Sequence, residues 1–308
     1  MTLPLFTLFE PARYERLWSA LRAMGPREAH RIMQALAAQD VIAFDEQAAA
    51  ADRSRAQADK ARAAMTALPA IPRRDIEAAA RRFGGYGPRM QIDATFITLW
   101  LNDPRLLFQV VEVRGLENLL EAARGGRGVL ALPLHLGASY VVPSLLAHFC
   151  PTRLVFNRMN VKELRRLSFP DLDLVGYPLS DDLTFRRGLE ALRAGHVFAM
   201  FPEYDPRGQR HRHEVVPFLG GRIAVPQGPV ILSASSGAPM LPVHLDSSGD
   251  GRHVLHIHRP VTAPRGDSER CDALHEVWAL IERLLLDGRL GDWEIWAAFE
   301  SMRAEQTP

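Results

Sequence analysis

Two long stretches of the chain carry no charged side chain, and this feature limits the folds that the sequence can adopt. Gly128–Thr152 and Ile223–Leu245 contain no Asp, Glu, Lys or Arg. About 20 apolar residues are enough to span a bilayer. Both stretches, however, are interrupted by prolines and by histidines, a density that a membrane-spanning helix does not tolerate. We therefore expect buried strand–loop–helix units around a globular core.

The composition of the 308 residues is that of a globular protein, with 47% hydrophobic and 24% charged residues. The formal net charge of +1 argues against a nucleic-acid partner bound by bulk electrostatics. The two cysteines, Cys150 and Cys271, stand alone and fit a reducing cytoplasm without a disulfide framework. Met1–Phe9 is too short and lacks the basic region of a signal peptide. We expect a cytoplasmic protein.

The first hundred residues are predicted to be helical, because apolar side chains such as Leu17, Trp18 and Leu21 recur at helical spacing. From about residue 106, short β-rich runs alternate with helical stretches, which is typical of an α/β sheet with parallel pairing. Val254–His258 alternates in hydropathy, as an antiparallel or edge strand does. We predict a helical region over 1–105, packed on an α/β domain over 106–308. The predicted strands are Phe108–Val113, Val129–Leu134, Arg153–Asn157, His196–Phe201, Met240–Leu245 and His253–Val261.

His135 is the first candidate functional residue, because it directly follows the apolar run Val129–Leu134 and precedes Gly137. Functional residues of open α/β sheets collect at the carboxyl ends of strands. Ser139 lies nearby, but it lacks the flanking glycines of a nucleophile elbow. Position alone leaves a structural histidine and a catalytic histidine both open.

A second polar cluster, Phe201–His213, also follows an apolar run. In it, Glu203 and Asp205 can orient a base, and Arg207 offers forked donors for phosphate. A solvated loop with internal ion pairs is the alternative. His211 with His213, and His256 with His258, lack a recognisable third ligand, so we predict no metal site.

Four short blocks in order resemble the lysophospholipid acyltransferase superfamily, and in particular the late acyltransferases of lipid A biosynthesis (the lauroyl and myristoyl transferases). The blocks are RGLEN at 114–118 with GRGVLALPLHLG at 126–137, LRAGHVF at 192–198 with FPE at 201–203, VPFLG at 216–220, and GAPMLPV at 237–243. The resemblance implies a glycerolipid-acyltransferase-like fold, with a mixed, mostly parallel sheet flanked by helices. It also implies that His135 is the general base of acyl transfer.

The chain departs from the family motif, in which the fifth residue after the histidine is Asp or Glu. Here that residue is Tyr140, and a phenol does not stabilise an imidazolium as a carboxylate does. Three interpretations follow. Glu203 supplies the missing acid; or His135 acts with Tyr140 as a neutral partner; or catalysis has been lost and a binding groove kept.

The resemblance predicts an acyltransferase that moves a fatty acyl group from acyl carrier protein or acyl-CoA to a hydroxyl or amine acceptor, without a cofactor. A degenerate acyl-chain or carrier-protein binding protein and a thioester hydrolase are the alternatives. The charge-free runs would line a hydrophobic groove for the acyl chain, and the N-terminal helices allow peripheral membrane contact. The expected substrate-binding residues are Arg158 and Arg207 for phosphate or phosphopantetheine, Asp205 of the acidic loop, and Gly137 and Gly220 near the oxyanion.

Overall fold

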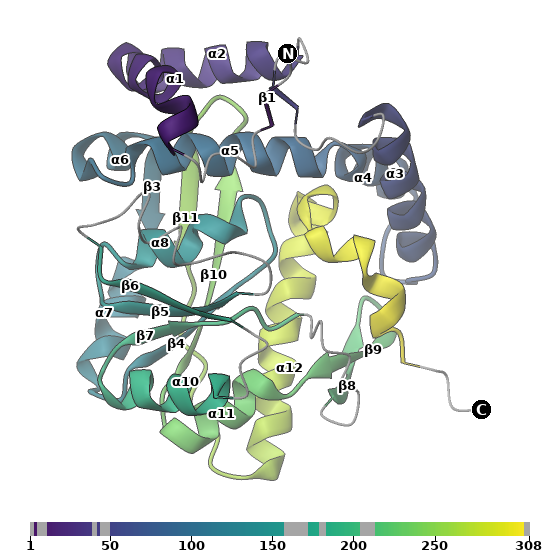
Figure 1. Cartoon of the computed structure of the whole chain (residues 1–308). Coiled ribbons are helices and arrows are strands. Elements are labelled where there is room, and N and C mark those ends of the chain that lie inside the picture. The colour runs from purple at the N-terminus through teal and green to yellow at the C-terminus, as the bar shows by residue number, and fades with distance from the viewer. Residues whose placement is uncertain are drawn as a thin grey trace.

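The computed structural model describes residues 3–4, 11–38, 42–43, 50–156, 172–178, 183–203 and 213–304. Its centre is a seven-stranded sheet of order β3-β11-β10-β4-β7-β5-β6 (Figure 1). Five of these strands, from β10 to β6, run parallel, while β11 pairs antiparallel with β10 and parallel with β3. The strands are β3 (Val111–Arg114), β4 (Val129–Pro133), β5 (Thr152–Phe156), β6 (Leu174–Pro178), β7 (Val197–Ala199), β10 (Met240–Ser247) and β11 (His253–Ile257). The predicted mixed, mostly parallel α/β fold is confirmed.

Strand β4 is the middle strand of this sheet, and all five of its residues are buried. Its side chains alternate between two hydrophobic clusters: Leu130 and Leu132 belong to one, Val129 and Ala131 to the other. A strand covered on both faces needs an unbroken apolar sequence. This requirement explains the first half of the charge-free run Gly128–Thr152.

Helices cover both faces of the sheet (Figure 1). Helix α12 (Asp267–Leu284) contributes Val277, Trp278 and Ile281 to the cluster that contains Leu132, and α5 (Tyr86–Trp100) contributes Phe96 and Trp100 to the other. The remaining helices are α1 (Pro11–Met24), α2 (Pro26–Ala38), α3 (Ala50–Thr66), α4 (Arg73–Gly84), α6 (Pro104–Val110), α7 (Leu116–Arg124), α8 (Val142–Leu146), α10 (Thr184–Arg193) and α11 (Gly228–Ser236). Among the described residues, none of the helices is both long enough and apolar enough to cross a bilayer.

The N-terminal helices share both hydrophobic clusters with the sheet. Met65 and Phe83 lie in the cluster of Leu132, and Trp18 and Met33 lie in the cluster of Val129. Residues before and after position 105 therefore form common cores. The division into 1–105 and 106–308 stays a prediction.

The strand predicted over Phe108–Val113 is wrong at its start, because α6 continues to Val110 and β3 begins at Val111. The Asp103 side chain accepts hydrogen bonds from the amides of Arg105 and Leu106, and Pro104 occupies the first helical turn. This cap, with proline at the first turn, stabilises a helix where the apolar run alone favours a strand. Strand β11 is antiparallel, as its alternation indicates, but it lies between β3 and β10 instead of at an edge.

The predicted strands do not include β6 or the hairpin of β8 (His213–Phe218) with β9 (Gly221–Pro226). The hairpin turns at Leu219 and Gly220, both with positive φ (50° and 77°). The side chain of Glu282 on α12 accepts a hydrogen bond from the Leu219 amide at 2.7 Å and so anchors the turn. The short β1 (Leu3–Pro4) and β2 (Ile42–Ala43) form a separate parallel pair.

The segment after α12 packs against the loop that follows the carboxyl end of β4. It consists of short helical turns over Leu285–Arg289, Leu290–Asp292, Glu294–Ala297 and Phe299–Met302. Trp293, Trp296 and Phe299 of this segment are almost completely buried. Leu136 forms an isolated β-bridge with Trp293. The segment thus fixes the loop that follows β4.

Two glycines before β4 give a matched test of packing. Gly126 and Gly128 both have positive φ, but a Cβ on Gly126 would meet open space, whereas one on Gly128 would lie 2.5 Å from the Leu192 carbonyl oxygen. We expect Gly126→Ala to cost about 1–2 kcal/mol of unfolding free energy through backbone strain. Gly128→Ala should cost about 1–3 kcal/mol more, because the backbone must move. Urea unfolding measures both, and equal losses would contradict this packing.

Candidate active site

His135 lies just beyond the carboxyl end of β4, where the backbone leaves the sheet. The amide of Leu134 still donates to Val243 on β10, at 2.8 Å, and the His135 side chain is 13% exposed. The neighbouring parallel strand β7 ends at Ala199, so the residues that follow it arrive at the same edge of the sheet. Parallel pairing therefore brings Phe201 and Glu203, the start of the second predicted cluster, to the end of β4 where His135 lies.

Glu203 is completely buried beside His135, and its carboxylate accepts three N–H donors. Glu203 Oε2 lies 2.6 Å from His135 Nδ1, and Oε1 accepts the His135 backbone amide at 2.9 Å. The third donor is the indole Nε1–H of Trp293, 2.9 Å from Oε1. A buried carboxylate is tolerated when its oxygens are satisfied in this way. The arrangement fixes both the backbone and the ring of His135.

The contact with Glu203 determines which ring nitrogen of His135 can act as a base. A carboxylate accepts hydrogen bonds, so Nδ1 carries the proton and Nε2 keeps its lone pair. Burial lowers the pKa of His135. The charge of Glu203, its hydrogen bond and the charge of Glu294 outweigh that effect and hold the pKa above its ordinary value. His135 is therefore arranged to take up a proton at Nε2.

Tyr140, at the position of the motif acid, does not contact Nδ1 of His135 in place of a carboxylate. Its hydroxyl donates to Glu294 Oε1 at 2.6 Å, and its ring is edge-on to the His135 ring at 6.2 Å between centroids. The backbone amide of Glu294 donates to the His135 carbonyl at 2.9 Å. Glu294 and Trp293 were missed from the sequence, because no motif or spacing links residues so far along the chain to His135.

Aromatic rings surround the imidazole of His135. The Phe201 ring lies 4.2 Å from it, centroid to centroid, and 5.9 Å from the ring of Tyr140. Tyr140 is 40% exposed, so this cluster reaches the surface. In the loop after β4, the Gly137 carbonyl accepts a hydrogen bond from the hydroxyl of the buried Tyr86 at 2.8 Å. Burial, followed by the charge of Glu294, raises the pKa of Tyr86 well above its ordinary value, so Tyr86 acts as a neutral donor.

The predicted substrate-binding residues differ in where they lie. Gly137 adopts φ of +60°, and its amide donates to the Asp292 carbonyl at 3.3 Å, so that N–H is already engaged. Gly220 lies in the β8–β9 turn, where an added Cβ would lie 3.0 Å from the Ala70 amide nitrogen. An oxyanion role for either glycine stays a prediction. Arg158, Asp205 and Arg207 fall outside the described residues.

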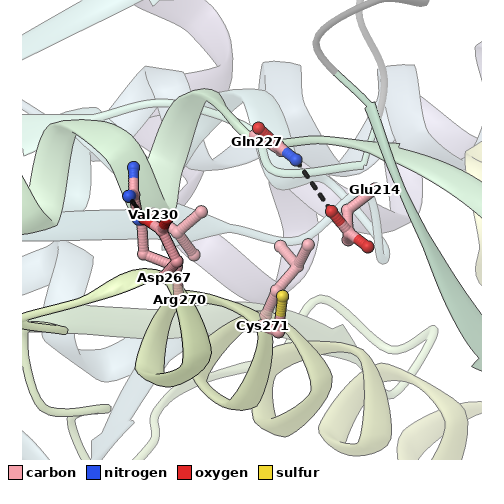
Figure 2. A pocket seen from close by; sticks show the side chains of 7 residues that line it. Glu214, Gln227, Val230, Asp267, Arg270 and Cys271 are labelled. Atoms are coloured by element: carbon pink, nitrogen blue, oxygen red, sulfur yellow. Dashed lines mark hydrogen bonds and ion pairs between the residues drawn. The ribbon is translucent and has the colours of Figure 1, made fainter.

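The two charge-free runs adjoin one another. The first forms β4, the His135 loop and α8, and the second forms β9, α11 and β10, which pairs with β4. A separate half-open pocket of about 360 Å³ lies between β8, α11 and α12 (Figure 2). Glu214, held by Gln227 at 2.8 Å, and the ion pair of Asp267 with Arg270 give this pocket a charged rim. It differs in character from the apolar groove expected for an acyl chain.

His244, Asp246 and His256 bring nitrogen and oxygen atoms within 4.8 Å of one another. Their geometry does not suit a shared metal ion, because the two imidazole rings are stacked with an interplanar angle of 2°. Lone pairs in parallel planes do not meet at one ion. Arg289 also binds both oxygens of Asp246, at 2.9 and 2.7 Å. The ion pair of Asp246 with Arg289 joins β10 to the segment after α12.

Comparison with known proteins identifies one family. Residues 89–277, more than half of the chain, match the family described as bacterial lipid A biosynthesis acyltransferase. No curated protein matches the chain. The matched region contains His135, Tyr140 and Glu203, whereas Trp293 and Glu294 lie beyond it.

The effect of Glu203 on His135 can be measured directly. In an NMR titration, the ring resonance of His135 should report a pKa above the ordinary value of about 6.5. Glu203→Gln should lower that pKa, because it removes the charge and leaves the burial. Glu300→Gln, at an exposed residue paired with Arg303, should leave it unchanged. The His135 resonance is identified by its loss in His135→Gln, and an unshifted value in Glu203→Gln would contradict the assigned contact.

Proposed function

The chain belongs to the bacterial lipid A biosynthesis acyltransferase family, and we propose that it transfers a fatty acyl group from an acyl thioester to a hydroxyl or amine acceptor, with His135 as general base. The observation that supports this most strongly is the 2.6 Å contact between His135 Nδ1 and the buried carboxylate of Glu203. That contact is what a histidine base requires: a fixed tautomer, a fixed ring and a counter-charge for the imidazolium.

In the proposed reaction, Nε2 of His135 takes the proton of the acceptor O–H or N–H. The acceptor atom then forms a bond with the thioester carbonyl carbon. When the tetrahedral intermediate collapses, the C–S bond breaks, and the sulfur takes the proton from Nε2 and leaves as a thiol. His135 is neutral again, and no covalent acyl-enzyme is formed. During the step, the Glu203 carboxylate stabilises the transient imidazolium through its contact with Nδ1.

Of the three interpretations of Tyr140, the contacts favour the one in which Glu203 supplies the acid. Glu203 is seated at Nδ1, whereas the Tyr140 hydroxyl is directed at Glu294. The buried carboxylate of Glu203 also joins the ends of β4 and β7, but its place at Nδ1 of His135 is the one that a general base requires. We therefore favour an active enzyme over a degenerate binding protein.

The donor in this proposal is an acyl carrier protein or coenzyme A thioester, and no cofactor takes part. The protein would work in the cytoplasm, with peripheral contact to the inner face of the membrane when its acyl substrate is there. The adjoining strands β4 and β10 of the two charge-free runs are packed in the hydrophobic core, so a groove for the acyl chain beside His135 remains part of the proposal.

Replacing the proposed base gives the first test of activity. His135→Gln should lower the rate of acyl transfer by about 10²–10⁴-fold, the usual contribution of a positioned base. The matched control is His275→Gln, at an exposed position of α12. The assay follows release of free thiol and formation of the acylated acceptor. Unchanged turnover would rule out the base, and thiol release with free fatty acid alone would identify a hydrolase.

The pH dependence of the rate separates the role of Glu203 from that of a purely structural residue. Because the base must be neutral, kcat/KM should rise with pH through the raised pKa of His135. Glu203→Gln should lower the maximum and move the rising limb to lower pH, since the charge that raises the pKa is lost. Folding of the variant is checked by its unfolding midpoint. A near-wild-type rate and profile would exclude Glu203 as the acid.

A further inference from the structure

A second carboxylate, Glu294, lies beside His135, and apart from its effect on the pKa of His135 it has no part in the reaction described so far. It is held twice: its backbone amide donates to the His135 carbonyl at 2.9 Å, and its Oε1 accepts the Tyr140 hydroxyl at 2.6 Å. Glu203 already occupies Nδ1 of His135. Glu294 is therefore available for a different task at the same site.

The other oxygen of Glu294 is unusual. Oε2 is covered, and it finds no hydrogen-bond donor among the residues that the structure describes. An unpaired carboxylate oxygen in such a place is costly, and the cost is relieved when a donor, above all a cationic one, reaches it. Glu294 as a whole is partly exposed, and its partner Tyr140 reaches the surface. A bound molecule can approach the pair from this exposed side, and it reaches the covered Oε2 only when the Glu294 carboxylate turns or a covering side chain moves.

The number of hydrogens on the acceptor decides which acceptor suits this arrangement. A hydroxyl has one hydrogen, and the base must take it, so nothing is left for Glu294. A primary amine enters as an ammonium with three N–H donors, so it can donate hydrogen bonds to His135 Nε2 and to a carboxylate at the same time. The two groups present acceptor atoms, Nε2 and a carboxylate oxygen, which complement a nitrogen that carries several hydrogens.

We propose that Glu294, positioned by Tyr140, binds the nitrogen of the acceptor, and that the acceptor is a primary amine. The inference rests on the proposed acyl transfer and narrows its acceptor class to N-acylation. Glu294 is a binding and specificity residue in this scheme, and Tyr140 is a positioning residue that acts through it.

The protons of the amine balance as follows. On entry, the ammonium gives one proton to solvent and becomes a neutral amine with two N–H groups. One N–H donates to the Glu294 carboxylate, and the other donates to Nε2 of His135. The nitrogen lone pair forms the C–N bond, Nε2 takes the second proton, and the C–S bond breaks. The thiolate leaves with that proton, and the third hydrogen remains on the amide product.

The test measures binding of hexylamine and hexan-1-ol, which share one carbon skeleton, to the full chain by calorimetry at neutral pH. Wild type should bind hexylamine more tightly than hexanol. Glu294→Gln should weaken hexylamine binding by about 10- to 100-fold, the loss expected for a hydrogen bond to a charged group. Hexanol binding should not change. Tyr140→Phe should weaken hexylamine binding by a smaller factor.

Glu300→Gln, an exposed carboxylate six positions further on and paired with Arg303, is the matched control and should bind both probes as wild type does. Equal hexylamine affinity in wild type and Glu294→Gln would overturn the inference. So would equal affinity of the wild type for amine and alcohol. The unfolding midpoint of each variant confirms that it is folded.

Turnover distinguishes failure of this inference from failure of the proposed function. If transfer depends on His135 but alcohols are acylated as readily as amines, the acyltransferase stands and the amine specificity is wrong. If no transfer depends on His135 with either acceptor, the proposed function is wrong. If amines are preferred and Glu294→Gln raises their KM more than it lowers kcat, both hold.

Discussion

The buried carboxylate of Glu203 is the interaction on which the site depends. It ties the end of β7 to the end of β4 through the His135 amide and ring, and it ties both to the C-terminal segment through Trp293. Three separate parts of the chain therefore converge on two oxygen atoms. Because each donor is also buried or nearly so, none of the three can move without leaving a polar group unpaired.

The proposed roles follow from how two carboxylates are placed around one imidazole. Glu203 lies at Nδ1 and sets the tautomer, whereas Glu294 contacts the backbone of His135 and the hydroxyl of Tyr140. Tyr140 stands where the family motif has an acid. Its phenol does not replace that acid at the ring, but it connects the motif position to a carboxylate from elsewhere in the chain.

The parts of this structure that were predictable from sequence depend on local pattern. The apolar run of β4, ending at His135, indicates a buried central strand, and parallel pairing with β7 makes the approach of Glu203 a reasonable expectation. Local sequence patterns do not predict structure that depends on a contact with a residue far away in the chain, or on a cap that overrides an apolar run. The cap at Asp103 extends α6 into a predicted strand, the turn at Leu219 depends on Glu282, and no local feature of Glu294 points to His135.

The C-terminal position of Trp293 and Glu294 has a consequence for synthesis of the protein. Tyr140 and its partner Glu294 are separated by 154 positions in the chain. Until residues 293 and 294 have left the ribosome, Glu203 lacks its indole donor, and the loop after β4 lacks its contacts with Trp293 and Glu294. The nascent chain can form its central strands early, but it acquires a complete reaction centre only after residues 293 and 294 have been synthesised and have folded onto the loop after β4.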